Sequence, residues 1–271
     1  MTSDVRPIGI YDSGVGGLST LREIRAALPH EPLVYLADAG YLPYGEKSQD
    51  TLERRALAVA DYFVSRGVKA IAVACNTATA AAIGTMRQHH PDLIVVGIEP
   101  AIKPAAQLSR SGVIGVFATT GTLASQRFAA LAQRAAPGSR IVLRPCPEWV
   151  MLVENGQLDD DAARASVNTA AGALLAEGAD VLVLGCTHFP FLQPLLRERV
   201  GPDVHIVEPG PALARHLAHR VQTEAATLLA PDGFVGGCEL VSSGDAGRLR
   251  AQARQLLQWD LPAVPLPPPW R

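Results

Sequence analysis

Short runs of Val, Ile and Leu alternate with longer segments rich in Ala and Leu along most of the chain. The short runs are continuously apolar rather than alternating with polar positions, which is typical of strands buried on both faces of a parallel sheet. Helical periodicity marks the segments 18–28, 51–67 and 163–178 between them. The pattern therefore predicts an α/β fold whose strands cover residues 7–13, 32–38, 69–75, 93–98, 113–119, 141–146, 180–186 and 204–209.

Short sequences from the first half of the chain recur in the second half. Residues 8–13 (IGIYDS) match residues 114–119 (IGVFAT), and residues 67–75 (GVKAIAVAC) match residues 178–186 (GADVLVLGC). The pair Glu99-Pro100 recurs as Glu208-Pro209. Three landmarks in the same order at nearly constant spacing indicate an internal repeat. We therefore expect two similar doubly wound parallel-sheet domains related by pseudo-two-fold symmetry, with the active site in the cleft between them.

The domain boundaries follow from the repeat. One α/β domain is predicted over residues 1–98 and the second over residues 99–207. The remaining segment, 208–271, carries two helical stretches, at 210–230 and 246–257, and a strand-like stretch at 238–245. It is too small for a third α/β domain, so we expect it to return to the first. The Pro-rich end, 261–271, is expected to be extended.

Composition limits the classes of partner. The formal net charge is −2 and no basic block stands out, which argues against nucleic acid or a membrane surface as partner. The N-terminal segment lacks the charged start and apolar core of a signal peptide. The four cysteines, Cys75, Cys146, Cys186 and Cys238, are far apart and form no CxxC pair, so they are expected to be free thiols.

Two of these thiols are placed for chemistry. Cys75 and Cys186 each follow a predicted strand directly, at the edge where parallel sheets bind their ligands. A helix is expected to begin after each, and a helix N-terminus lowers the pKa of a cysteine. If the two halves face each other, one thiol can accept a proton from a ligand while the other donates one to its opposite face. Asp12 and His188, in neighbouring turns, could assist these transfers.

Other uses of the same residues fit less well. Zinc needs three or four ligands, and only Cys186 and His188 are close in sequence, so no metal site is predicted. A Cys–His nucleophile would explain Cys186 but would leave the matched Cys75 without a role. The glycine-rich loop 14–17 departs from nucleotide-binding patterns and is better suited to a tight turn beside a small anion.

Several blocks together resemble the cofactor-independent glutamate racemases. They are DSGVGG at 12–17, LPYG at 42–45, ACNTAT at 74–79, TTGT at 119–122, LGCTHFP at 184–190, ENG at 154–156 and SSGD at 242–245. They span most of the chain in the order of that family. Two positions depart from the family pattern: Ala118 stands where a glycine is expected, and Phe189 where tyrosine is common.

The resemblance implies an isomerase that interconverts L- and D-glutamate at Cα without a cofactor. It implies Cys75 and Cys186 as the two acid–base groups, Asp12 and His188 as their respective supports, and Glu154 as a further acidic participant. It also implies a cytoplasmic enzyme that supplies D-glutamate for peptidoglycan synthesis. The implied substrate contacts are Asp12, Ser13, Tyr44, Gly45, Asn76, Thr77, Thr119, Thr122, Thr187 and His188.

Two alternatives stay open at this point. Aspartate racemases share the two-cysteine plan, so the substrate could be aspartate or another small acidic amino acid. A small-molecule binding protein could use the same cleft without turnover. The partner expected in each case is a small molecule; the sequence does not determine whether the chain forms a homodimer.

Overall fold

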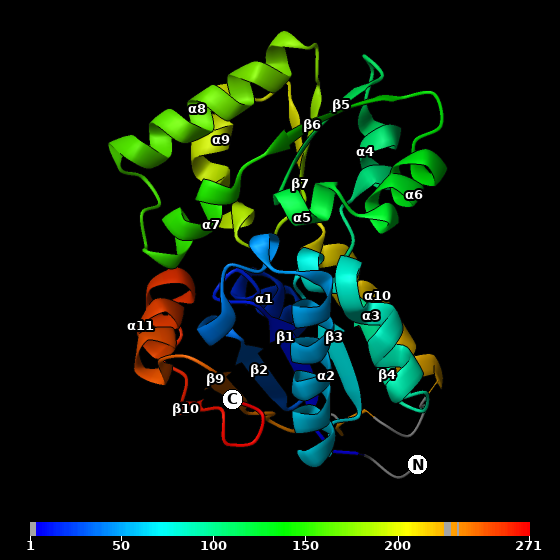
Figure 1. Cartoon of the computed structure of the whole chain (residues 1–271), viewed down its shortest axis with the longest axis vertical. Helices are drawn as coiled ribbons and strands as arrows, with labels where there is room; N and C mark the ends of the chain where they lie inside the picture. Colours follow the sequence, from blue (N-terminus) through cyan, green and yellow to red (C-terminus); the bar gives the residue numbers. More distant parts are fainter. Residues whose placement is uncertain (1–3, 225–228, 232) are drawn as a thin grey trace.

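The computed structural model describes residues 4–224, 229–231 and 233–271, and it has the α/β architecture that the sequence predicts. Within these described ranges, ten strands form two sheets in which every pairing is parallel. The first sheet has the order β10-β9-β2-β1-β3-β4 and the second the order β6-β5-β7-β8 (Figure 1). The strands are β1 (Ile8–Asp12), β2 (Leu33–Ala37), β3 (Ala70–Val73), β4 (Ile94–Gly97), β5 (Val113–Ala118), β6 (Arg140–Pro145), β7 (Val181–Leu184), β8 (His205–Val207), β9 (Cys238–Ser242) and β10 (Ala263–Pro265).

Helices cover both faces of each sheet. On the first sheet, one face packs against α1 (Leu18–Ala27), α10 (Gly210–Glu224) and α11 (Ala246–Leu257), and the other against α2 (Gln49–Ser65) and α3 (Asn76–His89). On the second sheet, α7 (Pro147–Glu154), α8 (Asp161–Ala176) and α9 (Gln193–Val200) lie on one face, and α4 (Ile102–Leu108), α5 (Thr120–Leu123) and α6 (Gln126–Ala135) on the other. No helix among the described residues is both long and apolar enough to span a bilayer.

The internal repeat is visible in the strand register. In the first sheet Ile8 pairs with Ala70, and in the second Ile114 pairs with Val181. These are the positions that the sequence repeat makes equivalent, and the orders β2-β1-β3-β4 and β6-β5-β7-β8 correspond strand for strand. The predicted pair of similar doubly wound sheets is therefore confirmed. Its consequence is that Cys75 and Cys186 occupy the same place in their sheets, two residues beyond Val73 and Leu184.

The C-terminal segment returns to the first sheet. β9 pairs with β2, β10 pairs with β9, and α10 packs against α1 (Figure 1). The helix expected over 210–230 is described over Gly210–Glu224, and residues 225–228 lie outside the described residues. The Pro-rich end contributes β10, a short edge strand, where a proline costs no hydrogen bond inside the sheet. The exact division at residues 98 and 207 stays a prediction.

Candidate active site

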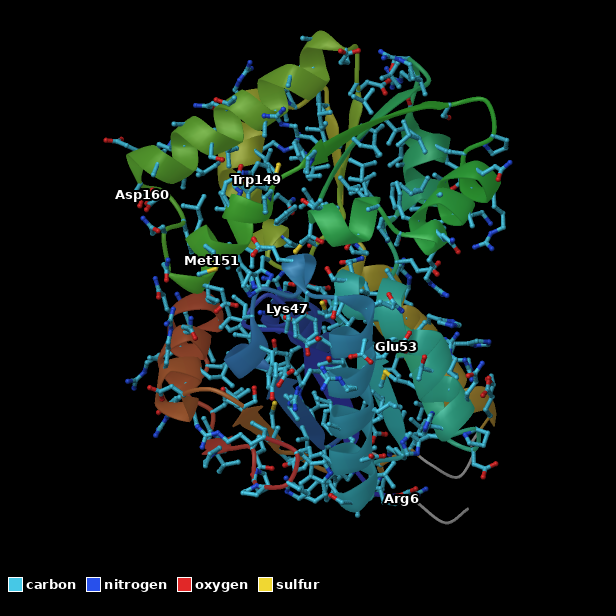
Figure 2. The ribbon with its side chains drawn as sticks, viewed as in Figure 1. Arg6, Lys47, Glu53, Trp149, Met151 and Asp160 are labelled. Carbon is cyan, nitrogen blue, oxygen red and sulfur yellow. The ribbon has the colours of Figure 1, made fainter. Side chains whose placement is uncertain are left out.

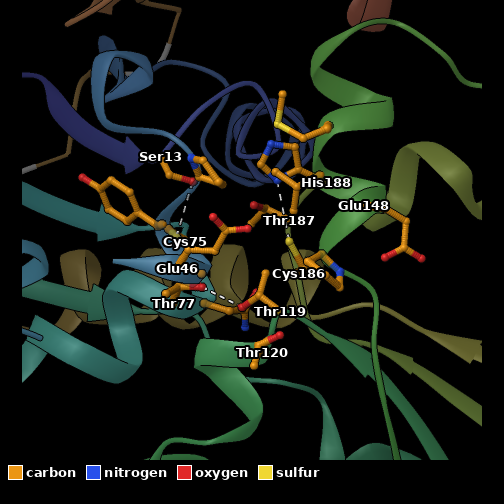
Figure 3. A pocket seen from close by; sticks show the side chains of 17 residues that line it. Ser13, Glu46, Cys75, Thr77, Thr119, Thr120, Glu148, Cys186, Thr187 and His188 are labelled. Atoms are coloured by element: carbon orange, nitrogen blue, oxygen red, sulfur yellow. Dashed lines mark hydrogen bonds between the residues drawn. The ribbon is translucent and has the colours of Figure 1, made fainter. Parts of the chain in front are cut away.

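Loops that follow β1, β3, β5 and β7 meet at one cavity of about 260 Å³. The carboxyl ends of the strands of both sheets thus open onto the same space, as expected for ligand sites of parallel sheets. Cys75 and Cys186 lie on different sides of it, and Thr77 and Thr119 lie next to each other below them in this view (Figure 3). The lining residues are Ser13, Pro43, Tyr44, Gly45, Glu46, Cys75, Asn76, Thr77, Thr119, Thr120, Pro147, Glu148, Val150, Met151, Cys186, Thr187 and His188.

Cys75 caps the N-terminus of α3. Its Sγ accepts a hydrogen bond from the Ala78 N–H at 3.4 Å, and its thiol lies 3.7 Å from Ser13 Oγ. The expectation that this position lowers its pKa is wrong: burial and the negative charge of Asp12 outweigh both contacts and raise the pKa of Cys75 to about 12. Cys75 is therefore a thiol at neutral pH.

Cys186 has a different environment. No α-helix begins directly after it, contrary to expectation; a turn leads instead into the 3-10 helix η3 (Phe189–Leu192). This turn places His188 Nδ1 3.6 Å from Cys186 Sγ, and His188 Nε2 lies 2.8 Å from Glu154 Oε1. A chain from thiol to imidazole to carboxylate results, as in cysteine sites that work with a histidine.

Pairing of His188 with Glu154 raises the pKa of His188 and lowers the pKa of Glu154. Burial lowers the pKa of His188, but its hydrogen bonds to Cys186 and Glu154 and their negative charge outweigh burial and hold it well above its usual range. Burial raises the pKa of Glu154, but the hydrogen bonds from His188 and the Val15 N–H and the charge of His188 lower it overall. Burial of both side chains opposes their charges, but the hydrogen bond and the mutual attraction outweigh it, so the pair is charged over a wide pH range.

Replacing Glu154 with Gln should therefore destabilise the fold in a pH-dependent way. The raised pKa of His188 contributes stability that is complete below about pH 6.5 and disappears as pH rises through the folded value. The lowered pKa of Glu154 contributes stability that is complete above about pH 4.3 and disappears as pH falls through its folded value. Between about pH 4.3 and about pH 6.5, we expect the variant to lose about 3 kcal/mol of unfolding free energy. The loss should become smaller at lower and at higher pH. Urea unfolding of both proteins from pH 4 to 9 measures it; a pH-independent difference would contradict the ion pair.

Several hydrogen bonds beside this pair join the two halves of the molecule. The Val15 N–H donates to Glu154 Oε1 at 2.8 Å, and Ser19 Oγ donates to the Thr187 carbonyl at 2.9 Å. Thr187 Oγ1 donates to Asp12 Oδ1 at 3.1 Å. Asp12 is fully buried behind the cavity wall, and burial raises its pKa against the opposing charge of His188. Asp12 thus acts on Cys75 through its charge rather than as a lining residue.

The lining offers neutral donors for a ligand. The hydroxyls of Thr77, Thr119 and Thr122 form a cluster with oxygen–oxygen distances of 2.9 to 3.2 Å. Both polar atoms of the buried Asn76 side chain lack a hydrogen-bond partner within the described protein, an arrangement that is costly unless a ligand or solvent supplies one. None of the described lining residues is Lys or Arg. A carboxylate bound here would be held by amides and hydroxyls.

Most of the site residues predicted from sequence come together. Ser13, Tyr44, Gly45, Asn76, Thr77, Thr119, Thr187, His188 and the two cysteines line the cavity, whereas Asp12, Thr122 and Glu154 lie behind it. Sequence reasoning missed the wall formed by Pro147, Glu148, Val150 and Met151 of α7, and also Glu46. Met151 lies where the two halves meet (Figure 2). The sequence feature that could have indicated this wall is the position of α7, which follows the carboxyl end of the predicted strand 141–146.

Comparison with known proteins identifies relatives of the whole arrangement. Residues 17–217 match the family model described as Asp/Glu/hydantoin racemase. A glutamate racemase of Methylococcus capsulatus is 54% identical over 83% of this chain and 82% of its own length. Among solved structures, a glutamate racemase of Bacillus anthracis is 29% identical with a TM-score of 0.87, covering 97% of this chain and 98% of that one. The glutamate racemase of Escherichia coli, solved with L-glutamate and an activator, is 32% identical with a TM-score of 0.81, covering 96% and 99%.

The match covers both sheets, the cavity between them and the loops that carry the two cysteines. The family model alone extends over most of the chain, and the relatives agree in name. The chain therefore belongs to the Asp/Glu/hydantoin racemase family, among its glutamate racemases.

Proposed function

We propose that this chain interconverts L- and D-glutamate by moving the Cα proton between Cys75 and Cys186 without a cofactor. The observation that carries the proposal is the placement of two thiols at equivalent positions of two sheets, both lining one cavity. An inversion at carbon needs a proton removed from one face and another delivered to the opposite face. A pair of like groups on different sides of the ligand provides both steps in both directions.

The proton balance is simple. The thiolate of one cysteine takes the Cα proton and becomes a thiol, and the electron pair of the C–H bond stays on the substrate. The thiol of the other cysteine then donates its proton to the opposite face of Cα and becomes a thiolate. The free enzyme is left with the reverse distribution of protons, which is the form that acts on the other enantiomer. Coupling between the two thiols makes this distribution a property of the pair.

The neighbours of the thiols support this exchange. A protonated His188, held by Glu154, stabilises negative charge on the adjacent Cys186 sulfur. Burial and the charge of Asp12 keep Cys75 protonated until it meets a carbanion on the substrate. The two cysteines thus differ in their surroundings: Cys186 has a charged imidazole beside it, whereas Cys75 faces burial and the charge of Asp12.

The uncharged residues that line the cavity must stabilise the carbanion. The Cα proton of an amino acid is very weakly acidic, so charge that develops on the α-carboxylate must be met by preorganised donors. The Asn76 amide, the hydroxyls of Thr77 and Thr119 and the N-terminus of α3 are available for this purpose. Their electrostatic interactions with the substrate are stronger where water is excluded.

Glutamate is favoured over aspartate because the named relatives are glutamate racemases over most of their length. We propose further that the product D-glutamate supplies peptidoglycan synthesis in the cytoplasm. Depleting the chain in its host should then create a requirement for external D-glutamate. Growth that is unaffected without it would contradict this role.

Proton exchange in D2O tests the reaction itself. The purified chain, without added cofactor, is mixed with L- or D-glutamate, and NMR follows deuterium at Cα while circular dichroism follows optical activity. Loss of optical activity with deuterium incorporation is the expected result. Exchange with aspartate but not glutamate would keep the mechanism and change the substrate, and no exchange with either would favour a binding protein.

The thiol chemistry of Cys75 gives a separate prediction. Because its pKa is raised to about 12, its alkylation rate should keep rising with pH up to at least pH 10, whereas a free thiol levels off above about pH 8.5. Iodoacetamide labelling at several pH values, with the rate at Cys75 followed by peptide mass spectrometry, measures this. Free cysteine in the same tube is the reference. A rate at Cys75 that levels off near pH 8 would show that its pKa is not raised.

A further inference from the structure

A buried network lies directly behind Tyr44 in the cavity wall. Tyr44 Oη donates to Asp38 Oδ2 at 2.6 Å, and Tyr11 Oη lies 2.6 Å from Tyr44 Oη. Because the single hydroxyl proton of Tyr44 goes to Asp38, Tyr11 must donate to Tyr44. The hydroxyl of Tyr44 is therefore engaged inside the protein, and Tyr44 offers its ring and backbone to the cavity.

Arg55 of α2 completes the network from the other side. Its Nη2 donates to Asp38 Oδ1 at 2.7 Å and its Nε to Asp38 Oδ2 at 2.9 Å, a two-pronged contact that fixes the plane of the carboxylate. The guanidinium carbon also lies 4.0 Å from the centre of the Tyr41 ring. Asp38 is fully buried and Arg55 nearly so, so the pair is shielded from water.

The end of the chain closes this network. The Trp270 carbonyl accepts a hydrogen bond from Arg55 Nη2 at 3.0 Å. The indole ring of Trp270 packs edge-on against Tyr62 of α2. Arg271 Nε donates to the Ser243 carbonyl at 3.2 Å. The last residues of the chain are thereby held over the network that supports Tyr44.

Residues 38–46 need such support because they contain little regular structure. After β2 the chain forms only two 3-10 helices of three residues each, η1 (Ala39–Tyr41) and η2 (Tyr44–Glu46). Turns this short do not hold their own position. Yet they supply Tyr44, Gly45 and Glu46 to the cavity wall. Side-chain contacts to Asp38 and Arg55, together with the hydrogen bond from the Gly40 N–H to Ser243 Oγ, hold this part of the wall relative to the sheet.

We propose that Arg55 and Asp38 are positioning residues for glutamate binding: they hold Tyr44 and Gly45 in place, with the Trp270 carbonyl as a third support. The inference rests on the proposed function. None of the described hydrogen bonds joins a side chain of this network to Cys75, Cys186 or His188. Loosening the network should therefore weaken binding of both enantiomers and leave proton transfer nearly unchanged.

The variant Arg55→Lys tests this, because it keeps the charge but loses the two-pronged contact and the stacking. We expect KM to rise about tenfold for both L- and D-glutamate, with kcat changed by less than about threefold. The matched control is Arg54→Lys, since Arg54 is the neighbouring arginine, exposed and paired with the exposed Asp50. Its KM and kcat should equal those of the native chain.

A purely structural role for Arg55 predicts other results. It would lower the unfolding temperature while leaving KM unchanged, and that outcome would overturn the inference, as would a fall in kcat at constant KM. A double-mutant cycle sharpens the distinction: in a Tyr44→Phe background, Arg55→Lys should raise KM much less than in the native chain. Equal effects in both backgrounds would show that Arg55 does not act through Tyr44.

Direct binding separates this inference from the proposed reaction. Calorimetric titration with D-glutamate should give a dissociation constant about tenfold higher for Arg55→Lys than for the native chain. If the native chain binds but does not turn over, the proposed function fails and the positioning role still stands on the dissociation constants. Should Arg55→Lys fail to fold, deletion of residues 270–271 is the second variant, and an unchanged dissociation constant there overturns the inference.

Discussion

Replacing either active-site cysteine with serine is expected to lower racemisation by about 10³-fold or more, because a serine hydroxyl is a poor proton acceptor and donor at neutral pH. One half-reaction should survive in each variant. In Cys75→Ser, the remaining Cys186 can still remove the Cα proton that faces it, exchange it with solvent and return a deuteron to the same face. Exchange without inversion is then expected for one enantiomer only. Cys186→Ser should exchange only the opposite enantiomer, and more slowly, because the pKa of Cys75 is about 12.

NMR in D2O with each pure enantiomer measures all four combinations of variant and substrate. The matched control is Cys238→Ser, which changes a half-buried thiol at the start of β9, at the end of the strand away from the cavity. This control should racemise glutamate at the native rate. Exchange of the same enantiomer by both cysteine variants would contradict placement of the thiols on opposite faces of the substrate.

The strands and the position of the cysteines were predictable from sequence because both depend on short-range patterns. Continuous apolar runs mark buried parallel strands, and a residue that directly follows such a run must lie at the carboxyl edge. The repeat added long-range information, since it made Cys75 and Cys186 equivalent before their sheets were known. The register of β1 with β3 and of β5 with β7 confirms that equivalence.

The electrostatics of the thiols were not predictable in the same way. A helix N-terminus after Cys75 is a local feature, and by itself it favours the thiolate. Burial and the charge of Asp12 have the larger effect, and Asp12 comes from a different strand of the sheet. Likewise, the proximity of Glu154 to His188 results from packing α7 against the turn after β7. Sequence patterns place each residue on its element, but packing between elements determines the pKa values.

The cavity wall formed by residues of α7 shows a second limit of prediction from sequence. Val150 and Met151 line the cavity, yet in sequence they belong to an ordinary amphipathic helix. Their role depends on the angle at which α7 crosses the end of the second sheet. Polar residues in turns draw attention as candidate ligand contacts, whereas apolar residues that complete a cavity resemble core residues until the structure is known.

Replacing Gly16 with alanine is expected to reduce kcat by about 100-fold while the chain stays folded. A Cβ at Gly16 would lie 2.3 Å from His188 Nδ1 and 2.6 to 2.7 Å from its Cγ and Cε1, so the imidazole must move. The atom that must move most is the one that contacts Cys186 Sγ, and Glu154 holds the other side of the ring. Overpacking at such a site costs about 1–3 kcal/mol, which a domain of ordinary stability survives.

The control for this substitution is Gly84→Ala in α3, where no atom lies within 4 Å of the added Cβ and the position is exposed. Alanine favours a helix more than glycine does, so this variant should be more stable by about 0.5–1 kcal/mol and fully active. Measuring kcat, KM and the unfolding midpoint of both variants separates the two effects. A native kcat in Gly16→Ala would mean that the contact between His188 and Cys186 is dispensable. A reduced kcat with a native unfolding midpoint would mean that the position of the imidazole, rather than global stability, limits proton transfer.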